Sequence, residues 1–263
     1  MRMLALLILL LGLSKALHAQ TTAVELREEI KNGQFQLWVK NNLPCTSQIF
    51  AESPSLNRKF HLSLPKQSER TLVKMPVDSI QNIDQFKNQL KYSFMLGDFN
   101  AIPDPKYLYM LPYPTGESHE LIQGNNGNHT HNTPESRYAF DFKMDEGSYV
   151  TAARGGVVGF IKQHNKEGGK DKRLMNKVNL IIVCHDDGTI AIYAHLKHRG
   201  ALVHIGEHVF AGQVIGFSGN TGYSTGPHLH FSVLAGEQSV PIRFRNLPEM
   251  LVEGESYEQN FDY

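Results

Sequence analysis

Apolar and polar residues alternate in short runs along the first part of the chain, which predicts β-strands rather than helices. The alternation is strict over residues 34–39 and 60–64, and residues 91–99 form a further candidate strand. We therefore expect a small β-sandwich-like accessory domain over residues 20–105. It carries no chemical motif of its own, and its one tryptophan, Trp38, is expected in the core rather than at a binding surface.

A stretch rich in proline and tyrosine, residues 106–120, is expected to connect this domain to the next one. Closely spaced prolines exclude regular helix and most sheet pairing. The tyrosines among them suggest either a ligand groove or packing onto the following domain, and packing is the favoured interpretation. The residues concerned are Tyr107, Tyr109, Pro112, Tyr113 and Pro114.

From residue 121 onward, strands separated by glycines dominate, and long helical periodicity is absent. Residues 155–161 and 206–218 are typical of antiparallel strands joined by tight turns. The predicted fold class is therefore mostly β. It comprises an antiparallel domain over residues 121–263, which includes a C-terminal extension, preceded by the small β-sandwich-like domain.

The N-terminus has the layout of a secretory signal peptide over residues 1–19. Arg2 precedes an apolar run over residues 3–13, and Ala19 stands at the expected cleavage point. An uncleaved anchor is the alternative. No later segment is long and apolar enough to cross a bilayer. We therefore expect an exported protein, periplasmic or extracellular, that is not bound to a membrane after signal cleavage.

Composition narrows the classes of function. The 26 Lys and Arg residues balance the 26 Asp and Glu residues, so nothing indicates the basic surface that non-specific nucleic-acid binding needs. Cys45 and Cys184 belong to no zinc-type cysteine pair, and two buried free thiols in separate domains are expected in preference to a disulfide. The 13 histidines are a high number for 263 residues, which makes metal chemistry worth seeking. The oligomeric state stays open.

One strand near the C-terminal end presents two histidines together. Alternation predicts Leu229, Phe231 and Val233 on the core face of this strand. His228 and His230 then project side by side from the other face. Such a pair suits one metal ligand beside one proton-transfer group, and a chance pair on the surface is the alternative.

Asp141 stands in another strand that is otherwise built for burial. Alternation predicts Tyr138, Phe140 and Phe142 on one face and Asp141 on the other. An unpaired buried carboxylate is costly. Asp141 therefore needs a partner, which is either a metal ion or an ordinary salt bridge or turn hydrogen bond.

A third strand, residues 190–196, contains His195. Alternation predicts that His195, Tyr193 and Ala191 share the face directed away from the core. A lone histidine of this kind is more often structural than functional, and Tyr193 is expected to pack rather than to assist catalysis. The predicted core-face residues are Ile190, Ile192, Ala194 and Leu196.

Taken together, these segments resemble the M23 (LytM-type, lysostaphin-like) zinc metallopeptidase family over about residues 120–235. Several motifs occur in the family's order, which makes the resemblance specific. They are His131 followed by Tyr138-Ala139-Phe140-Asp141-Phe142, Gly147, Ala152-Ala153-Arg154-Gly155-Gly156-Val157-Val158, His185-Asp186-Asp187-Gly188-Thr189, Tyr193-Ala194-His195-Leu196, Gly216-Phe217-Ser218-Gly219-Asn220-Thr221-Gly222 and Gly226-Pro227-His228-Leu229-His230-Phe231. The resemblance implies an antiparallel LytM-type peptidase fold.

The resemblance also implies a division of labour among five residues. His131, Asp141 and His230 would be the zinc ligands, and His195 and His228 the catalytic histidines. Three protein ligands keep the fourth coordination position of zinc open, as catalytic zinc sites require. Of the two catalytic histidines, one would accept a proton and the other would hydrogen-bond the developing oxyanion; which does which stays open.

The chain departs from the family pattern at the first ligand. The shorter family motif places a histidine four positions before the aspartate, where this chain has Arg137. His131, ten positions before Asp141, is the expected substitute, and His129 is the rival ligand.

The implied function is zinc-dependent hydrolysis of amide bonds in peptidoglycan peptides by an endopeptidase. The alternative is a non-catalytic LytM-type module that binds the wall or activates another enzyme. A serine hydrolase is disfavoured, because the elbow-like run 222–226 precedes Pro227 and a strand where an elbow needs a helix. A closed structural zinc site would need a fourth ligand such as His185, which instead begins a turn.

The basic insertion 166–177 is expected to be a mobile loop at the groove rim. The bond cut and the role of the N-terminal domain stay open.

Overall fold

The computed structural model describes residues 23–80, 82–127 and 130–260. These residues form two compact units that divide between Asp98 and Phe99. The expected signal peptide and the rival ligand His129 lie outside the described residues. None of the helices in the described part of the chain is long and apolar enough to cross a membrane.

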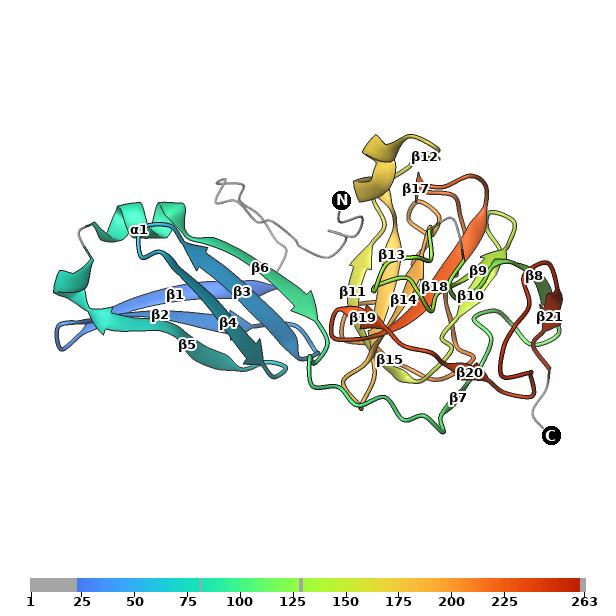
Figure 1. Cartoon of the computed structure of the whole chain (residues 1–263), viewed down its shortest axis with the longest axis horizontal. Coiled ribbons are helices and arrows are strands. Elements are labelled where there is room, and N and C mark those ends of the chain that lie inside the picture. The colour runs from blue at the N-terminus through green and yellow to red at the C-terminus, as the bar shows by residue number, and fades with distance from the viewer. Residues whose placement is uncertain (1–22, 81, 128–129, 261–263) are drawn as a thin grey trace. The chain divides into compact units, whose positions relative to one another are not determined.

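The N-terminal unit contains two three-stranded antiparallel sheets (Figure 1). One has the order β1 (Val24–Lys31), β2 (Gln34–Asn41), β5 (Glu69–Pro76), and the other has the order β4 (Arg58–Leu64), β3 (Ser47–Ser53), β6 (Lys91–Leu96). Phe35 and Leu37 from the first sheet share a hydrophobic core with Ala51 from the second. The strands predicted from alternation are therefore present, and the unit is β-rich as expected.

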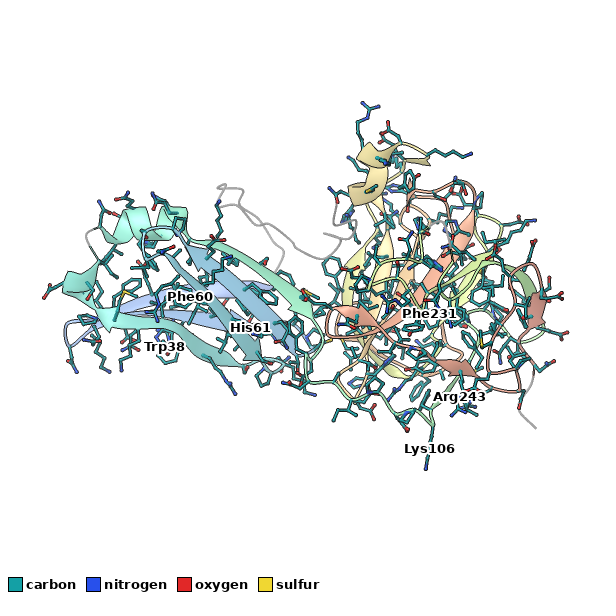
Figure 2. The ribbon with its side chains drawn as sticks, in the orientation of Figure 1. Trp38, Phe60, His61, Lys106, Phe231 and Arg243 are labelled. Carbon is teal, nitrogen blue, oxygen red and sulfur yellow. The ribbon has the colours of Figure 1, made fainter. Side chains whose placement is uncertain are left out.

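Trp38 lies outside this core, which contradicts its prediction. Phe35, Leu37 and Val39 point inward on β2, so the strand period of two turns Trp38 to the opposite face. There the Arg27 guanidinium lies 5.4 Å from the centroid of the indole ring. Figure 2 labels Trp38 among the side chains of this unit.

Two short helical elements, η1 (Val77–Ser79) and α1 (Ile83–Gln89), connect β5 to β6. The side chain of Asn82 caps α1 by accepting a hydrogen bond from the Gln85 backbone N–H at 2.8 Å. Phe86 is the buried residue of this helix and packs edge-on against Phe35. The helix has seven residues, too few to display the helical periodicity by which it could have been predicted.

The C-terminal unit is built on a nine-stranded sheet. Its strands, in spatial order, are β15 (His208–Val209), β11 (Gly156–Lys162), β13 (Leu180–Cys184), β14 (Ile190–Ala194), β18 (His228–Ala235), β9 (Phe140–Lys143), β8 (Ser118–Gln123) and β21 (Ser256–Glu258), with β19 (Gln238–Ser239) paired to β18. Smaller pairs are β10 (Tyr149–Thr151) with β16 (Val214–Phe217), β12 (Gly168–Gly169) with β17 (Gly222–Tyr223), and β7 (Leu108–Tyr109) with β20 (Arg243–Phe244). The predicted antiparallel, mostly β fold is present.

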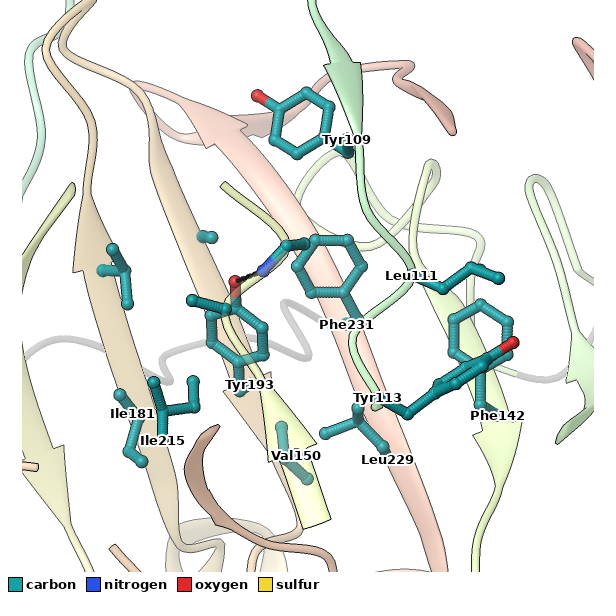
Figure 3. Packing of buried hydrophobic residues seen from close by; sticks show 14 of the residues in the cluster. Tyr109, Leu111, Tyr113, Phe142, Val150, Ile181, Tyr193, Ile215, Leu229 and Phe231 are labelled. Carbon is teal, nitrogen blue, oxygen red and sulfur yellow. Dashed lines mark hydrogen bonds between the residues drawn. The ribbon is translucent and has the colours of Figure 1, made fainter. Parts of the chain in front are cut away.

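One face of the central strands packs into a hydrophobic core, shown in Figure 3. Phe231 on β18 pairs in register with Tyr193 on β14 and with Phe140 on β9, so the three rings line up across the sheet. Tyr109 and Tyr113 from the proline-rich stretch join the same core. The prediction that these tyrosines pack onto the following domain is therefore confirmed.

The predicted faces of β14 are reversed in the structure. Tyr193 and Ala191 belong to the core, where the fully buried Tyr193 hydroxyl accepts a hydrogen bond from the Ala153 N–H at 2.8 Å (Figure 3). Ile192 and Ala194 line a groove on the other face. Alternation could not decide between the faces because every residue of β14 is buried.

One other expectation is corrected. Cys45 and Cys184 are both disulfide-bonded and leave no free cysteine among the described residues, so the prediction of free thiols is wrong. The insertion 166–177 contains β12 and the 3-10 helix η2 (Lys172–Lys177), and its residues Lys170 and Met175 line the groove, as expected of a segment at the groove rim. Its strand β12 runs parallel to β17, immediately before the segment that leads to His228.

Candidate metal centre

Strand register places two of the predicted ligands side by side. His230 on β18 is paired directly with Asp141 on β9, and Ala194 on β14 is the partner of His230 on the other side. All three side chains line the same groove, opposite the core. The faces predicted for β18 and β9 are therefore confirmed.

His131 reaches the same point from the loop before β9. One ligand atom each from His131, Asp141 and His230 lies within 4.8 Å of the other two. His131 is fully buried and Asp141 is 7% exposed. The structure thus brings together the three residues for which the sequence predicted metal binding.

Hydrogen bonds orient the two imidazoles toward the carboxylate. His131 Nδ1 donates to the Gly124 carbonyl at 2.8 Å, which leaves Nε2 as the nitrogen that faces Asp141. That Nε2 is buried and has no hydrogen-bond partner, although it lies 3.3 Å from Asp141 Oδ1. His230 Nδ1 lies 2.8 Å from the same oxygen.

The chemistry of this donor set fits a zinc ion. The buried His131 Nε2 makes no hydrogen bond, and it converges with a carboxylate oxygen of Asp141 and an imidazole nitrogen of His230. Burial alone would raise the pKa of Asp141, but its interactions with His131 and His230 hold the pKa well below its usual value. The centre therefore offers one anionic oxygen and two nitrogens, a His₂Asp set of the kind found in catalytic zinc sites.

His195 and His228 lie beside this centre. Their ring centroids are 4.4 Å apart, and the His195 ring is 6.1 Å from that of His230. His195 Nδ1 donates to the Thr221 carbonyl and His228 Nδ1 donates to the Gly226 carbonyl, each at 2.8 Å. Because each Nδ1 is engaged in this way, Nε2 is the nitrogen that each ring has left for a ligand in the groove.

Burial favours the neutral form of His195. It lowers the pKa of this imidazole to about 3, and the nearby charges of His228 and His230 act in the same direction. A left-handed backbone, with φ of 62°, turns His195 at the end of β14 into the groove that Ala194 also lines. This interruption of the alternation explains how Tyr193 lies in the core while His195 lines the groove.

The groove has a volume of about 740 Å³. Asp141, His195, His228 and His230 all line it, whereas His131 lies behind them. Its other lining residues are Ile122, Gln123, Thr130, Thr133, Glu135, Ser136, Lys170, Met175, Val178, Ile192, Ala194, Tyr223, Ser224, Thr225 and Ser232.

Thr221 and Ser224, for which the sequence predicted no such role, hold the catalytic candidates in place. Thr221 accepts from His195 through its carbonyl, and its hydroxyl donates to the Leu196 carbonyl at 2.7 Å. Ser224 donates to the Gly226 carbonyl at 2.8 Å, the same oxygen that accepts from His228. Ser224 Oγ also lies 3.3 Å from His228 Nδ1. The shorter contacts run through backbone carbonyls, which no spacing of side-chain types in the sequence reveals.

Other readings of the motifs find no support in the geometry. Ser224 lies before strand β18 rather than before a helix, so it does not form a nucleophile elbow. His185 is not in the candidate metal cluster of the described residues; its Nδ1 lies 2.8 Å from the Thr189 hydroxyl. A fourth protein ligand from His185 is therefore excluded by this arrangement.

Comparison with known proteins points to one family. The model of Peptidase family M23 matches residues 135–242. The chain is 38% identical over 121 residues to Glycyl-glycine endopeptidase ALE-1 of Staphylococcus capitis, covering 46% of this chain and 26% of that protein. It is 34% identical over 108 residues to Peptidoglycan DD-endopeptidase ShyA of Vibrio cholerae serotype O1, covering 41% and 22%.

A solved structure is also similar in sequence. The catalytic domain of the antimicrobial peptidase lysostaphin from Staphylococcus simulans is 32% identical, with a TM-score of 0.31, over 51% of this chain and 85% of that one. The chain spans about a quarter or less of the length of the two curated relatives. His131 lies before the first residue matched by the family model.

Proposed function

Because the C-terminal unit belongs to peptidase family M23, we propose that this protein is an exported zinc-dependent endopeptidase that hydrolyses amide bonds in peptidoglycan peptides. The observation that carries the proposal is the convergence of one ligand atom each from His131, Asp141 and His230 within 4.8 Å, beside a groove that Asp141 and His230 line. A site that only stabilised the fold would have no need of the two further histidines in the groove wall. The substrate class is supported by relatives whose names record peptidoglycan and glycyl-glycine endopeptidases.

His131, Asp141 and His230 would hold the zinc ion, which supplies Lewis acidity toward an amide carbonyl and toward water. The remaining chemistry falls to His195 and His228. Each fixes its Nδ1 proton on a backbone carbonyl, so each presents Nε2 to the groove. One accepts a proton from the attacking water, and the other donates a hydrogen bond to the oxygen on which negative charge develops.

All five positions are filled by residues able to do this chemistry, which favours an enzyme over a non-catalytic binding or activator module. The proposed location follows from the signal-peptide layout of residues 1–19, in which Arg2 precedes an apolar run and Ala19 stands at the expected cleavage point. Export would bring the enzyme to the polymer on which it acts.

The test is release of peptides from purified peptidoglycan, analysed by mass spectrometry. We expect new amino and carboxyl termini at one type of amide bond, loss of release with a zinc chelator, and recovery when zinc is added back. Zinc-loaded protein that binds peptidoglycan but releases no peptide would refute the enzyme and favour the binding module.

A further inference from the structure

The groove carries one basic residue and one acidic residue that the catalytic scheme does not use. Lys170 and Glu135 both line it. Neither has a hydrogen bond or an ion pair with any residue that the structure describes. Their charges are therefore available to a ligand.

Lys170 is held on one side of the groove by the insertion 166–177. The Gly222 N–H donates to the Glu167 carbonyl at 2.8 Å, and the Ser224 N–H donates to the Gly169 carbonyl at 3.1 Å. These two bonds fix the backbone just before Lys170 to the segment that leads to His228. Lys170 thus extends from a backbone segment that is hydrogen-bonded into the wall of the groove.

Glu135 is held on the other side, in the loop between His131 and β9. Its neighbour Pro134 accepts two hydrogen bonds from Ser239, through the backbone N–H and the hydroxyl, both at 2.9 Å. Ser239, on β19, pairs with Leu234 near the C-terminal end of β18, whereas the insertion is bonded to the segment just before the N-terminal end of β18. His230 therefore lies on β18 between these two points of attachment.

The surroundings of Lys170 strengthen its attraction for an anion. The insertion contains five basic side chains against two acidic ones, and one of the acids, Asp171, is already paired with Arg173. Met175, from the same insertion, also lines the groove. A peptide lying against it would shield the lysine from water, which strengthens the interaction between opposite charges.

We propose that Lys170 is a specificity residue that pairs with a carboxylate of the substrate peptide, and that Glu135 keeps carboxylates away from the opposite end of the groove. This inference rests on the proposed endopeptidase function. It assigns the enzyme to acidic peptides with a free carboxylate on the insertion side of the scissile bond. An uncharged bridge such as oligoglycine makes no use of either residue.

The test compares two cross-linked peptidoglycan peptides that differ only in one group, a free carboxylate or its carboxamide. We expect the wild type to prefer the carboxylate about threefold to tenfold in kcat/KM, mainly through KM. Lys170→Gln should abolish the preference, and high salt should weaken it in the wild type. Lys172→Gln is the matched control, because Lys172 is exposed on the same insertion but does not line the groove.

A preference that survives Lys170→Gln, or is absent from the wild type, overturns the inference while leaving the endopeptidase intact. Calorimetric binding of the same two peptides to His228→Ala provides a readout that needs no turnover. If no peptide is hydrolysed, a carboxylate preference in binding that disappears in the double variant with Lys170→Gln still supports the inference. Equal binding of both peptides overturns it.

Discussion

Tyr193→Phe separates a structural role from a catalytic one with the loss of a single oxygen atom. Tyr193 follows Ile192 and precedes Ala194, which both line the groove, yet its own ring lies in the core. Its hydroxyl accepts from the Ala153 N–H at 2.8 Å, and both residues are fully buried. Removal of the hydroxyl leaves that N–H without an acceptor and without access to water.

The expected cost follows from this geometry. A buried donor left unsatisfied destabilises a protein by about 1–3 kcal/mol. For a unit of this size each kcal/mol lowers Tm by about 2–4 °C, so we expect a decrease of roughly 2–12 °C. Because the ring itself is retained, packing against Phe231 persists and the groove keeps its shape.

Calorimetric unfolding and peptide hydrolysis, measured on one preparation, check both halves of this prediction. Tyr193→Phe should lower Tm while kcat/KM at 25 °C stays within about twofold of the wild type. Tyr149→Phe is the control, because Tyr149 is 48% exposed and its loss should change neither quantity. A more than tenfold fall in kcat with unchanged Tm would refute the placement of Tyr193 in the core and assign it to the reaction.

Two further predictions concern buried polar groups. Burial lowers the pKa of His185 to about 3, with the Arg154 charge adding to the effect; since the unfolded value is about 6.5, its contribution to stability is present above that pH and is lost as pH falls. Between pH 7 and pH 5 the free energy of unfolding, measured with urea, should fall by about 2 kcal/mol more in the wild type than in His185→Gln. Equal decreases in the two proteins would contradict this reasoning. Asn179 is fully buried, and its side-chain amide N–H groups donate hydrogen bonds to the carbonyls of Asn165 and Leu196, at 2.8 and 3.3 Å. Asn179→Ala removes both hydrogen bonds. It should destabilise by about 2–4 kcal/mol and reduce hydrolysis, because Leu196 follows His195; unchanged unfolding would show that the network is dispensable.

The sequence predicted what depends on local alternation. Along the first six residues of β18, apolar side chains occur on one face only. Leu229, Phe231 and Val233 could therefore be assigned to the core, and the two histidines to the opposite face. The β class followed from many such short runs.

What escaped prediction depends on contacts between distant segments or on single backbone angles. The prediction assigned the two faces of β14 the wrong way round because both faces are apolar and buried. The left-handed backbone of His195 then interrupts the two-residue alternation of the strand. Trp38 turned outward because its neighbours on β2, also apolar, fill the core. The proximity of His131 to Asp141 came only from the family resemblance, since no local pattern links a loop histidine to a strand ten residues away. The assignment of the three ligands stays a prediction.

The most direct test of the central claim is the zinc content of the purified protein, measured by mass spectrometry together with hydrolysis. Wild type should contain about one zinc ion per chain, and His230→Ala should lose both metal and activity. His228→Ala should retain the metal and lose activity, because His228 lies in the groove wall beside the three ligands. Full zinc occupancy in His230→Ala, or full activity in His228→Ala, would contradict the site described here.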